Sequence, residues 1–148
     1  EHHDGLLLAT RLQQGTRALT RMWSHDLHWQ AEYVTRFFDD QLDLHFRCEE
    51  EVVFPAASEH VPGQKPVVEK LIGQHRRLQS LVEYFRKPAN SALGTNLREF
   101  GAILEEHIRI EEREFFPKCE EGIPEDVLSA MESRMKQFMT GPAHATGH

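Results

Sequence analysis

Apolar residues recur along the chain at the three- and four-residue spacing of amphipathic helices, and no stretch alternates apolar and polar residues as a strand would. The pattern predicts a first helix over residues 6–23 and a second over 27–54. A third is expected over 67–85 and a fourth over 97–115, each separated from its neighbour by turn-forming residues. A shorter fifth helix is expected over 127–139. The pattern therefore favours an all-helical protein.

Four long amphipathic helices with short connections are typical of an up-down-up-down four-helix bundle. We therefore predict an all-α bundle with a short additional C-terminal helix, forming a single domain over residues 1–140. Residues 141–148 combine glycine and proline with no apolar period, so we expect them to form a flexible tail.

Composition and charge narrow the possible functions. The net charge of −7 argues against electrostatic binding of nucleic acid. The two cysteines argue against a disulfide framework or a thiolate metal cage. No apolar run approaches the roughly 20 residues of a membrane-spanning helix, and no export signal is visible, so the cytoplasm is the expected location. Ten histidines point instead toward metal, because histidine is the commonest metal ligand.

An internal repeat joins the second and fourth predicted helices. Residues 45–55 read His-Phe-Arg-Cys-Glu-Glu-Glu-Val-Val-Phe-Pro, and residues 107–117 read His-Ile-Arg-Ile-Glu-Glu-Arg-Glu-Phe-Phe-Pro. The histidine, the arginine, two glutamates, the phenylalanine and the proline coincide, which indicates a pseudo-symmetric site between the two helices. The shared arginines, Arg47 and Arg109, are expected to form surface ion pairs, with Glu50 and Glu112 as candidate partners.

The His-x-x-x-Glu spacing within the repeat places two potential metal ligands on the same face of a helix. Four residues turn through about 400° on a helix with ~6 Å of rise, so His45 with Glu49, and His107 with Glu111, each project from one face. These faces also carry the apolar residues, so both pairs should point inward. A single pair of this kind is usually a mild surface contact. Two pairs on apolar stripes would bury two carboxylates, which requires protons or metal ions, and we favour metal.

The other two helices offer further histidine ligands. His75 lies in line with Leu71 and Leu78 on the third helix. Alone it would be a hydrogen-bonded core residue, but beside two inward His/Glu pairs it becomes a candidate ligand. On the first helix His2 stands in the apolar stripe, with His3 as the alternative or as an outer partner.

The motifs together resemble those of the hemerythrin-like, His-His-Glu (HHE) cation-binding family. The resemblance rests on Glu1-His2-His3, on Gln74-His75-x-x-Leu78, and on the two blocks that run from His45 to Pro55 and from His107 to Pro117. It implies two non-haem iron ions with a bridging oxo, hydroxo or water, for which zinc or manganese could substitute. It also implies a ligand set of His2, His45, Glu49, His75, His107 and Glu111, with the two glutamates as bridging carboxylates.

The sequence departs from the oxygen-carrying members of that family in two places. Those members have a second histidine one turn further along the third helix, where this chain has Gln79. Their fourth-helix acid lies five residues after its histidine, at the position of Glu112, whereas Glu111 has the four-residue spacing of many other relatives. The missing histidine leaves a metal position open for water, dioxygen, peroxide or nitric oxide, unless Gln79 fills it weakly.

The function expected from the sequence is a metal-binding protein that binds or senses a small diatomic ligand (O2 or NO) or iron itself. One alternative is a di-iron enzyme acting on peroxide or nitric oxide in repair under nitrosative stress, and another is a structural, metal-stabilised regulatory module. A non-enzymatic role is favoured, because no acid/base pair is visible beyond the ligands. The ridge of Met131, Met135 and Met139 either packs in the core or faces a partner chain, which leaves a homodimer open.

Overall fold

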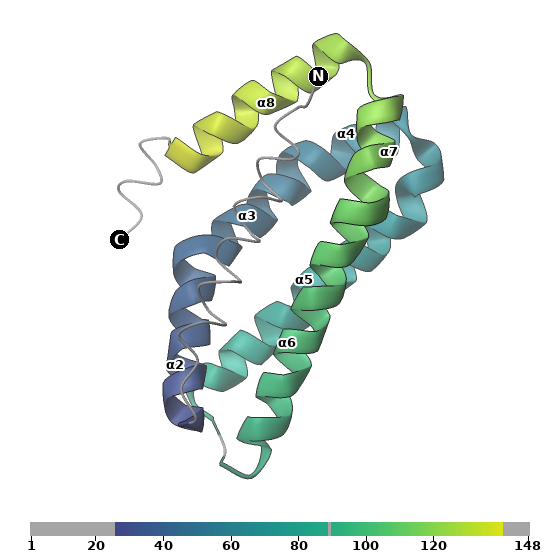
Figure 1. The fold of residues 1–148 in the computed structure, drawn as a ribbon. Coiled ribbons are helices and arrows are strands. Elements are labelled where there is room, and N and C mark those ends of the chain that lie inside the picture. The colour runs from purple at the N-terminus through teal and green to yellow at the C-terminus, as the bar shows by residue number, and fades with distance from the viewer. Residues whose placement is uncertain (1–25, 89, 141–148) are drawn as a thin grey trace.

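The structure is a computed structural model that describes residues 26–88 and 90–140, and this part of the chain is helical with no strand (Figure 1). The first predicted helix over 6–23, the candidate ligands His2 and His3, and the tail over 141–148 lie outside the described residues. No helix of the described part combines the length and the apolar character needed to cross a membrane.

The second predicted helix is one continuous helical run. It begins at Asp26, whose carboxylate accepts hydrogen bonds from the backbone N–H groups of His28 and Trp29 at 2.9 and 3.3 Å and so caps the helix. Its segments follow one another without a break: α2 (Leu27–Phe37), η1 (Phe38–Leu42), α3 (Asp43–Cys48), η2 (Glu49–Val53) and α4 (Phe54–His60).

The remaining helices complete the bundle. The run passes through the turn η3 (Pro62–Gln64) into the long α5 (Lys65–Arg86), and through η4 (Asn90–Ala92) into α6. Helix α2 contacts α5 and α6 near one end of the bundle, and α5 also packs against α6 (Figure 1). The closing elements are α6 (Leu93–Ile110), η5 (Glu111–Phe115), α7 (Phe116–Gly122) and α8 (Glu125–Thr140). The predicted all-α bundle and its extra C-terminal helix are therefore confirmed for the described residues.

Two π-helical turns, η2 and η5, occupy the same place in the two halves of the internal repeat. In each turn a backbone N–H donates to the carbonyl five residues earlier, from Phe54 to Glu49 and from Phe116 to Glu111. Two residues after the end of each turn comes a proline, Pro55 or Pro117, which lacks an N–H and crowds the carbonyl four residues before it. A widened turn relieves that crowding. The apolar pattern predicted that the helices would end near these prolines; instead they continue to His60 and Gly122.

The core has two apolar clusters, one at each end of the described bundle. Helix α8 packs against α3 and η2, and it contributes Leu128, Met131 and Met135 to one of these clusters, which is called the second cluster below. Met131 and Met135 are therefore core residues, as one of the two interpretations of the methionine ridge predicted. The first cluster includes Leu42, Phe46, Leu78, Val82, Phe85 and Phe100. The second includes Val52, Val53, Phe54, Leu71, Phe115 and Phe116.

Two exposed helical glycines provide a test of the helix assignment. Gly73 in α5 and Gly101 in α6 have no atom within 4 Å of where a Cβ would lie. Glycine is roughly 1 kcal/mol less favourable than alanine inside a helix, so Gly73→Ala and Gly101→Ala should each raise the free energy of unfolding by about 0.5–1 kcal/mol. Gly122→Ala is the contrasting variant, because its Cβ would lie 2.8 Å from Val61 Cγ2, and it should destabilise the protein. Urea unfolding measures all three; unchanged midpoints for the first two would contradict the assignment.

Candidate metal centre

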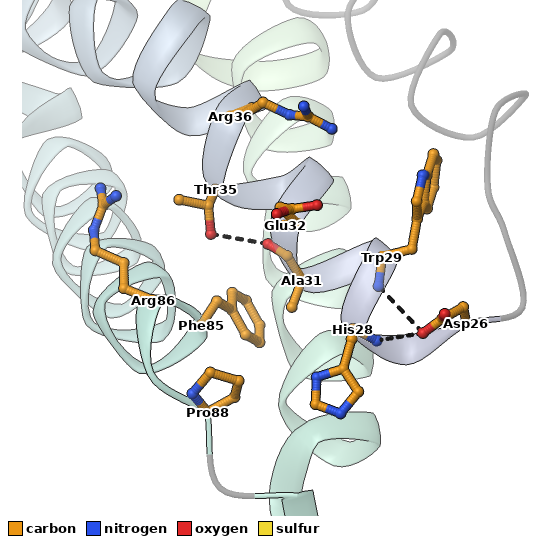
Figure 2. A pocket seen from close by; sticks show the side chains of 10 residues that line it. All are labelled: Asp26, His28, Trp29, Ala31, Glu32, Thr35, Arg36, Phe85, Arg86 and Pro88. Carbon is orange, nitrogen blue, oxygen red and sulfur yellow. Dashed lines mark hydrogen bonds between the residues drawn. The ribbon is translucent and has the colours of Figure 1, made fainter.

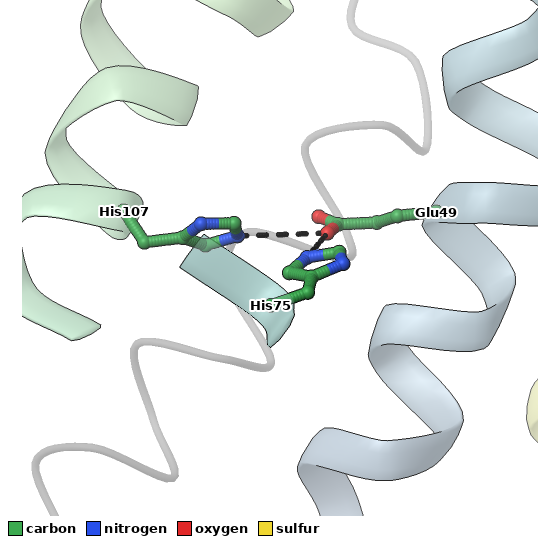
Figure 3. Close-up of side chains that lie close together, drawn as sticks. All are labelled: Glu49, His75 and His107. Atoms are coloured by element: carbon green, nitrogen blue, oxygen red, sulfur yellow. Dashed lines mark hydrogen bonds and ion pairs between the residues drawn. The ribbon is translucent and has the colours of Figure 1, made fainter. Parts of the chain in front are cut away.

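Four polar side chains meet in the interior of the bundle, each at most 1% exposed: Glu49, His75, His107 and Glu111. Glu49 Oε1 lies 2.9 Å from His75 Nε2 and 3.6 Å from His107 Nε2, so one carboxylate faces both imidazoles (Figure 3). His107 Nε2 lies 3.2 Å from Glu111 Oε2. Three helical runs therefore bring two carboxylates and two imidazoles together.

The local fold places these residues in matched positions. Glu49 is the first residue of η2 and Glu111 is the first residue of η5, so both π turns begin at the carboxylates of the centre. π turns inside α-helices are frequent at functional sites. The internal repeat thus extends from sequence to backbone conformation.

Aromatic rings hold His75 in place. Phe46 stacks on the His75 ring with centroids 3.8 Å apart and planes at 15°, and Phe54 lies near the same ring at 5.6 Å. Phe46 belongs to the first apolar cluster and Phe54 to the second. The centre therefore lies where the two clusters meet, away from water, and electrostatic interactions there are strong.

The two buried carboxylates do not behave alike. Burial by itself raises the pKa of Glu49, but its close polar contacts with Glu111, His107 and His75 outweigh it and bring that pKa well below the ordinary value. Burial and the negative charge of Glu49 raise the pKa of Glu111 well above the ordinary value. Without a metal, the pair therefore favours one ionised and one protonated carboxyl, as expected when two like charges share a dry site.

The imidazole of His107 is strongly affected by these acids. Burial opposes its protonated form, but the close approach of the Glu111 and Glu49 carboxyl groups raises the pKa of His107 to about 10. At neutral pH the metal-free centre therefore keeps protons on its buried groups. A metal ion must displace them in order to bind the lone pairs of the same atoms.

Several nitrogen and oxygen atoms of the centre that could bind a metal have no hydrogen-bond partner among the described residues. They are Glu49 Oε2, His107 Nε2 and both carboxylate oxygens of Glu111, all of them buried. Leaving such atoms buried and unsatisfied costs about 1–3 kcal/mol each, and more for charged groups. Carboxylate oxygens and imidazole nitrogens without thiolate suit iron, manganese, zinc or cobalt. The residues present therefore fit a bound divalent metal.

The nitrogens on the outer side of the two imidazoles also have partners. His75 Nδ1 lies 2.7 Å from Glu50 Oε2, and Arg76 donates to both oxygens of Glu50 at 2.7 and 3.0 Å. Burial raises the pKa of Glu50, but the hydrogen bonds with Arg76 and His75 outweigh it and lower that pKa below the ordinary value. His107 Nδ1 lies 2.8 Å from the Gln74 side-chain oxygen. Such outer partners fix the orientation and tautomer of ligand histidines.

These outer partners were missed by the sequence-based expectations. Arg47 forms a surface ion pair, as expected, but its partner is Asp43 at 3.6 Å rather than the candidate acids Glu50 and Glu112. Arg109 likewise pairs with Glu105, at 3.5 Å. The signal in the sequence was the run Gln74-His75-Arg76 in α5. The side chain of Gln74 contacts His107, and those of His75 and Arg76 contact Glu50.

The other predicted ligands have different outcomes. His45 is 3% exposed and lies one helical turn before Glu49 on the same helical run, as its spacing predicted. Its role as a ligand stays a prediction. His2 and its alternative His3 fall outside the described residues. Gln79 is half-buried, and its side-chain oxygen accepts a hydrogen bond from Arg76 at 3.1 Å.

Both cysteines are buried thiols. Burial, the largest effect, and neighbouring carboxylates such as Glu49 for Cys48 and Glu111 for Cys119 raise the pKa of each thiol to about 12. Because the thiolate is the reactive form, so high a pKa makes both thiols poor nucleophiles at neutral pH.

A hollow of about 680 Å³ lies away from the centre, between the start of α2 and the end of α5 (Figure 2). Two of its charged side chains are engaged in structural contacts: Asp26 caps α2, and Arg86 pairs with Asp39 at 2.8 Å and Glu83 at 3.1 Å. Within the described residues, the group that gathers three potential metal ligands within 4.8 Å is Glu49, His75 and His107. The buried centre is therefore the stronger candidate site.

A helical bundle with a buried centre of imidazoles and carboxylates defines a class of metal-binding bundle proteins. Within that class, the chain matches the family model of the hemerythrin HHE cation binding domain over residues 1–119. It belongs to this family. Comparison with curated proteins gave no match, and comparison with solved structures gave none either.

Proposed function

We propose that the chain holds two non-haem iron ions in the bundle and uses them to bind or sense a small diatomic ligand, dioxygen or nitric oxide. The observation that carries the proposal is the set of buried, unsatisfied donor atoms on Glu49, His107 and Glu111. Membership of a cation-binding family supports the same conclusion. His75, His45 and His2 complete the proposed ligand set.

Two ions are favoured over one by the charges of the centre. Two carboxylates in an apolar interior repel each other, and one of them must hold a proton when no cation is present. Two divalent ions would offset both charges, and each carboxylate has two oxygens with which to reach them. Bound iron would supply a redox-active Lewis acid with affinity for small diatomic ligands.

The surroundings of the centre suit an apolar, diatomic ligand. Phe46 and Phe54 are buried against His75, and the buried Phe115 packs on Phe54, so aromatic rings surround this side of the centre. The side-chain oxygen of Gln79 is bonded to Arg76, which supports an open metal position rather than one filled by Gln79.

Spectroscopy of the iron-loaded protein tests this function. The reduced protein is exposed to nitric oxide under nitrogen, and separately to dioxygen, while the visible spectrum is recorded. A new absorption band that is saturable with one of the gases is expected. Iron-loaded protein whose spectrum is insensitive to both gases would contradict diatomic binding. If removing the iron also unfolded that protein, the metal would be a structural support.

A further inference from the structure

The two imidazoles of the centre are supported differently on their outer sides. His75 Nδ1 faces the Glu50 carboxylate at 2.7 Å, and the His75 side chain is fully buried while that of Glu50 is 23% exposed. His107 Nδ1 faces the neutral amide oxygen of Gln74 at 2.8 Å, inside the core. One imidazole therefore has an anionic partner and the other has an uncharged partner.

This difference is not a consequence of the internal repeat. Glu50 has its counterpart in Glu112, yet Glu112 is exposed. What distinguishes Glu50 is Arg76, whose guanidinium donates hydrogen bonds to both oxygens of the Glu50 carboxylate at 2.7 and 3.0 Å. A two-point contact of this kind fixes the orientation of a carboxylate as well as its charge. Glu50 is therefore held against His75 by a residue that the other half of the site lacks.

We propose that Glu50, clamped by Arg76, is a positioning residue that holds the Nδ1 hydrogen of His75, presents Nε2 as the ligand atom, and strengthens metal binding. This inference rests on the proposed metal centre and adds to it a residue that touches no metal. A carboxylate only accepts hydrogen bonds, so the nitrogen facing it must carry the hydrogen. The opposite nitrogen, Nε2, faces the Glu49 carboxylate at 2.9 Å in the interior, so a metal ion bound between His75 and Glu49 would take the place of the hydrogen on Nε2 while Nδ1 keeps its own.

The charge of Glu50 also changes the donor strength of the imidazole. A hydrogen bond from Nδ1 to a carboxylate makes the ring a better electron donor than a bond to a neutral amide does. His75 should therefore be the stronger imidazole ligand of the pair, and His107 the weaker. Two inequivalent metal positions are the expected result.

Matched variants separate the charge of Glu50 from its geometry. Glu50→Gln keeps an acceptor oxygen without the charge, Glu50→Ala removes both, and Glu112→Gln is the control at the corresponding exposed position. Cobalt(II) affinity is measured by competition with a chelator. Loss of an outer partner typically weakens metal binding about 10- to 100-fold. We expect about a 10-fold loss for Glu50→Gln, about a 100-fold loss for Glu50→Ala, and no change for Glu112→Gln.

A second readout detects the hydrogen itself. The Nδ1–H of His75 should give a downfield proton signal coupled to ring ¹⁵N, present in the wild type with or without metal and lost in Glu50→Ala. Unchanged cobalt affinity and an unchanged signal in both Glu50 variants would overturn the proposal. If the wild type bound no cobalt, the proposed metal centre would fail. The NMR signal alone would then test whether Glu50 positions the ring of His75. Loss of the signal in Glu50→Ala would support that role, and a retained signal would overturn it.

Discussion

Replacing Glu49 with glutamine is expected to weaken divalent-metal binding at least ~100-fold, equivalent to about 2.7 kcal/mol of binding free energy. Glu49 is fully buried and its Oε1 faces both His75 and His107, so it is central to the donor set. Glutamine fills nearly the same volume but removes the negative charge that attracts a cation. Metal content after dialysis against iron(II) or cobalt(II), with chelator competition for the affinity, measures the effect.

The matched control for Glu49→Gln is Glu51→Gln. Glu51 lies in the same π turn but is exposed, so its replacement changes the net charge equally without touching the centre. Circular dichroism establishes that both variants keep their helices. Equal metal affinity in the two variants would show that Glu49 is not a ligand.

The metal-free protein is expected to become less stable as pH rises from about 6.5 toward 10, whereas the metal-loaded protein should not. The pKa of His107 is raised from 6.5 to about 10 in the folded state by Glu111 and Glu49, despite the opposing effect of burial. Its contribution to stability is therefore complete below pH 6.5, where both states hold the proton, and is lost as pH approaches 10. Each such proton changes the free energy of unfolding by at most about 1.4 kcal/mol per pH unit.

Glu111 acts in the same direction, because its raised pKa means that the folded state holds its proton more tightly than the unfolded chain does. Glu49 acts oppositely and only in acid, since its lowered pKa contributes stability that is lost at low pH. Metal binding displaces the protons, so it should tighten as pH rises.

Urea unfolding at pH 7, 8 and 9, with and without metal, measures this pH dependence. Glu111→Gln is the control, because a neutral side chain removes much of the interaction that raises the pKa of His107, so its stability should depend less on pH. Equal stability of the metal-free wild type at pH 7 and 9 would contradict the proton-holding centre.

The fold was largely predictable because helix periodicity is a local property. Apolar residues at helical spacing located the described helices, and the additional C-terminal helix emerged from the same pattern. The errors occurred near Pro55 and Pro117, where the helices expected over 27–54 and 97–115 continue further than the apolar pattern indicated. Each proline follows a π turn, and the wider turn lets the helix continue past a residue that would otherwise break it.

The centre was predictable only in part. Glu49, His107 and Glu111 could be found because residues four apart on the apolar face of a helix point the same way, into the core, and the sequence repeats this spacing on two helices. The Glu50–Arg76 clamp could not, because it joins two helices whose relative position depends on packing. The repeat was even misleading on this point, since Glu112 matches Glu50 in sequence but is exposed.

The central claim is that Glu49, His75, His107 and Glu111 hold metal in the interior of the bundle. An anomalous-scattering map from crystals of protein loaded with iron or cobalt tests it most directly. The account predicts peaks at about 2.0–2.2 Å from Glu49 oxygen and from the Nε2 atoms of His75 and His107, distances usual for such ligands. A map with no peak among these four side chains, or with metal bound instead at exposed histidines, would contradict it.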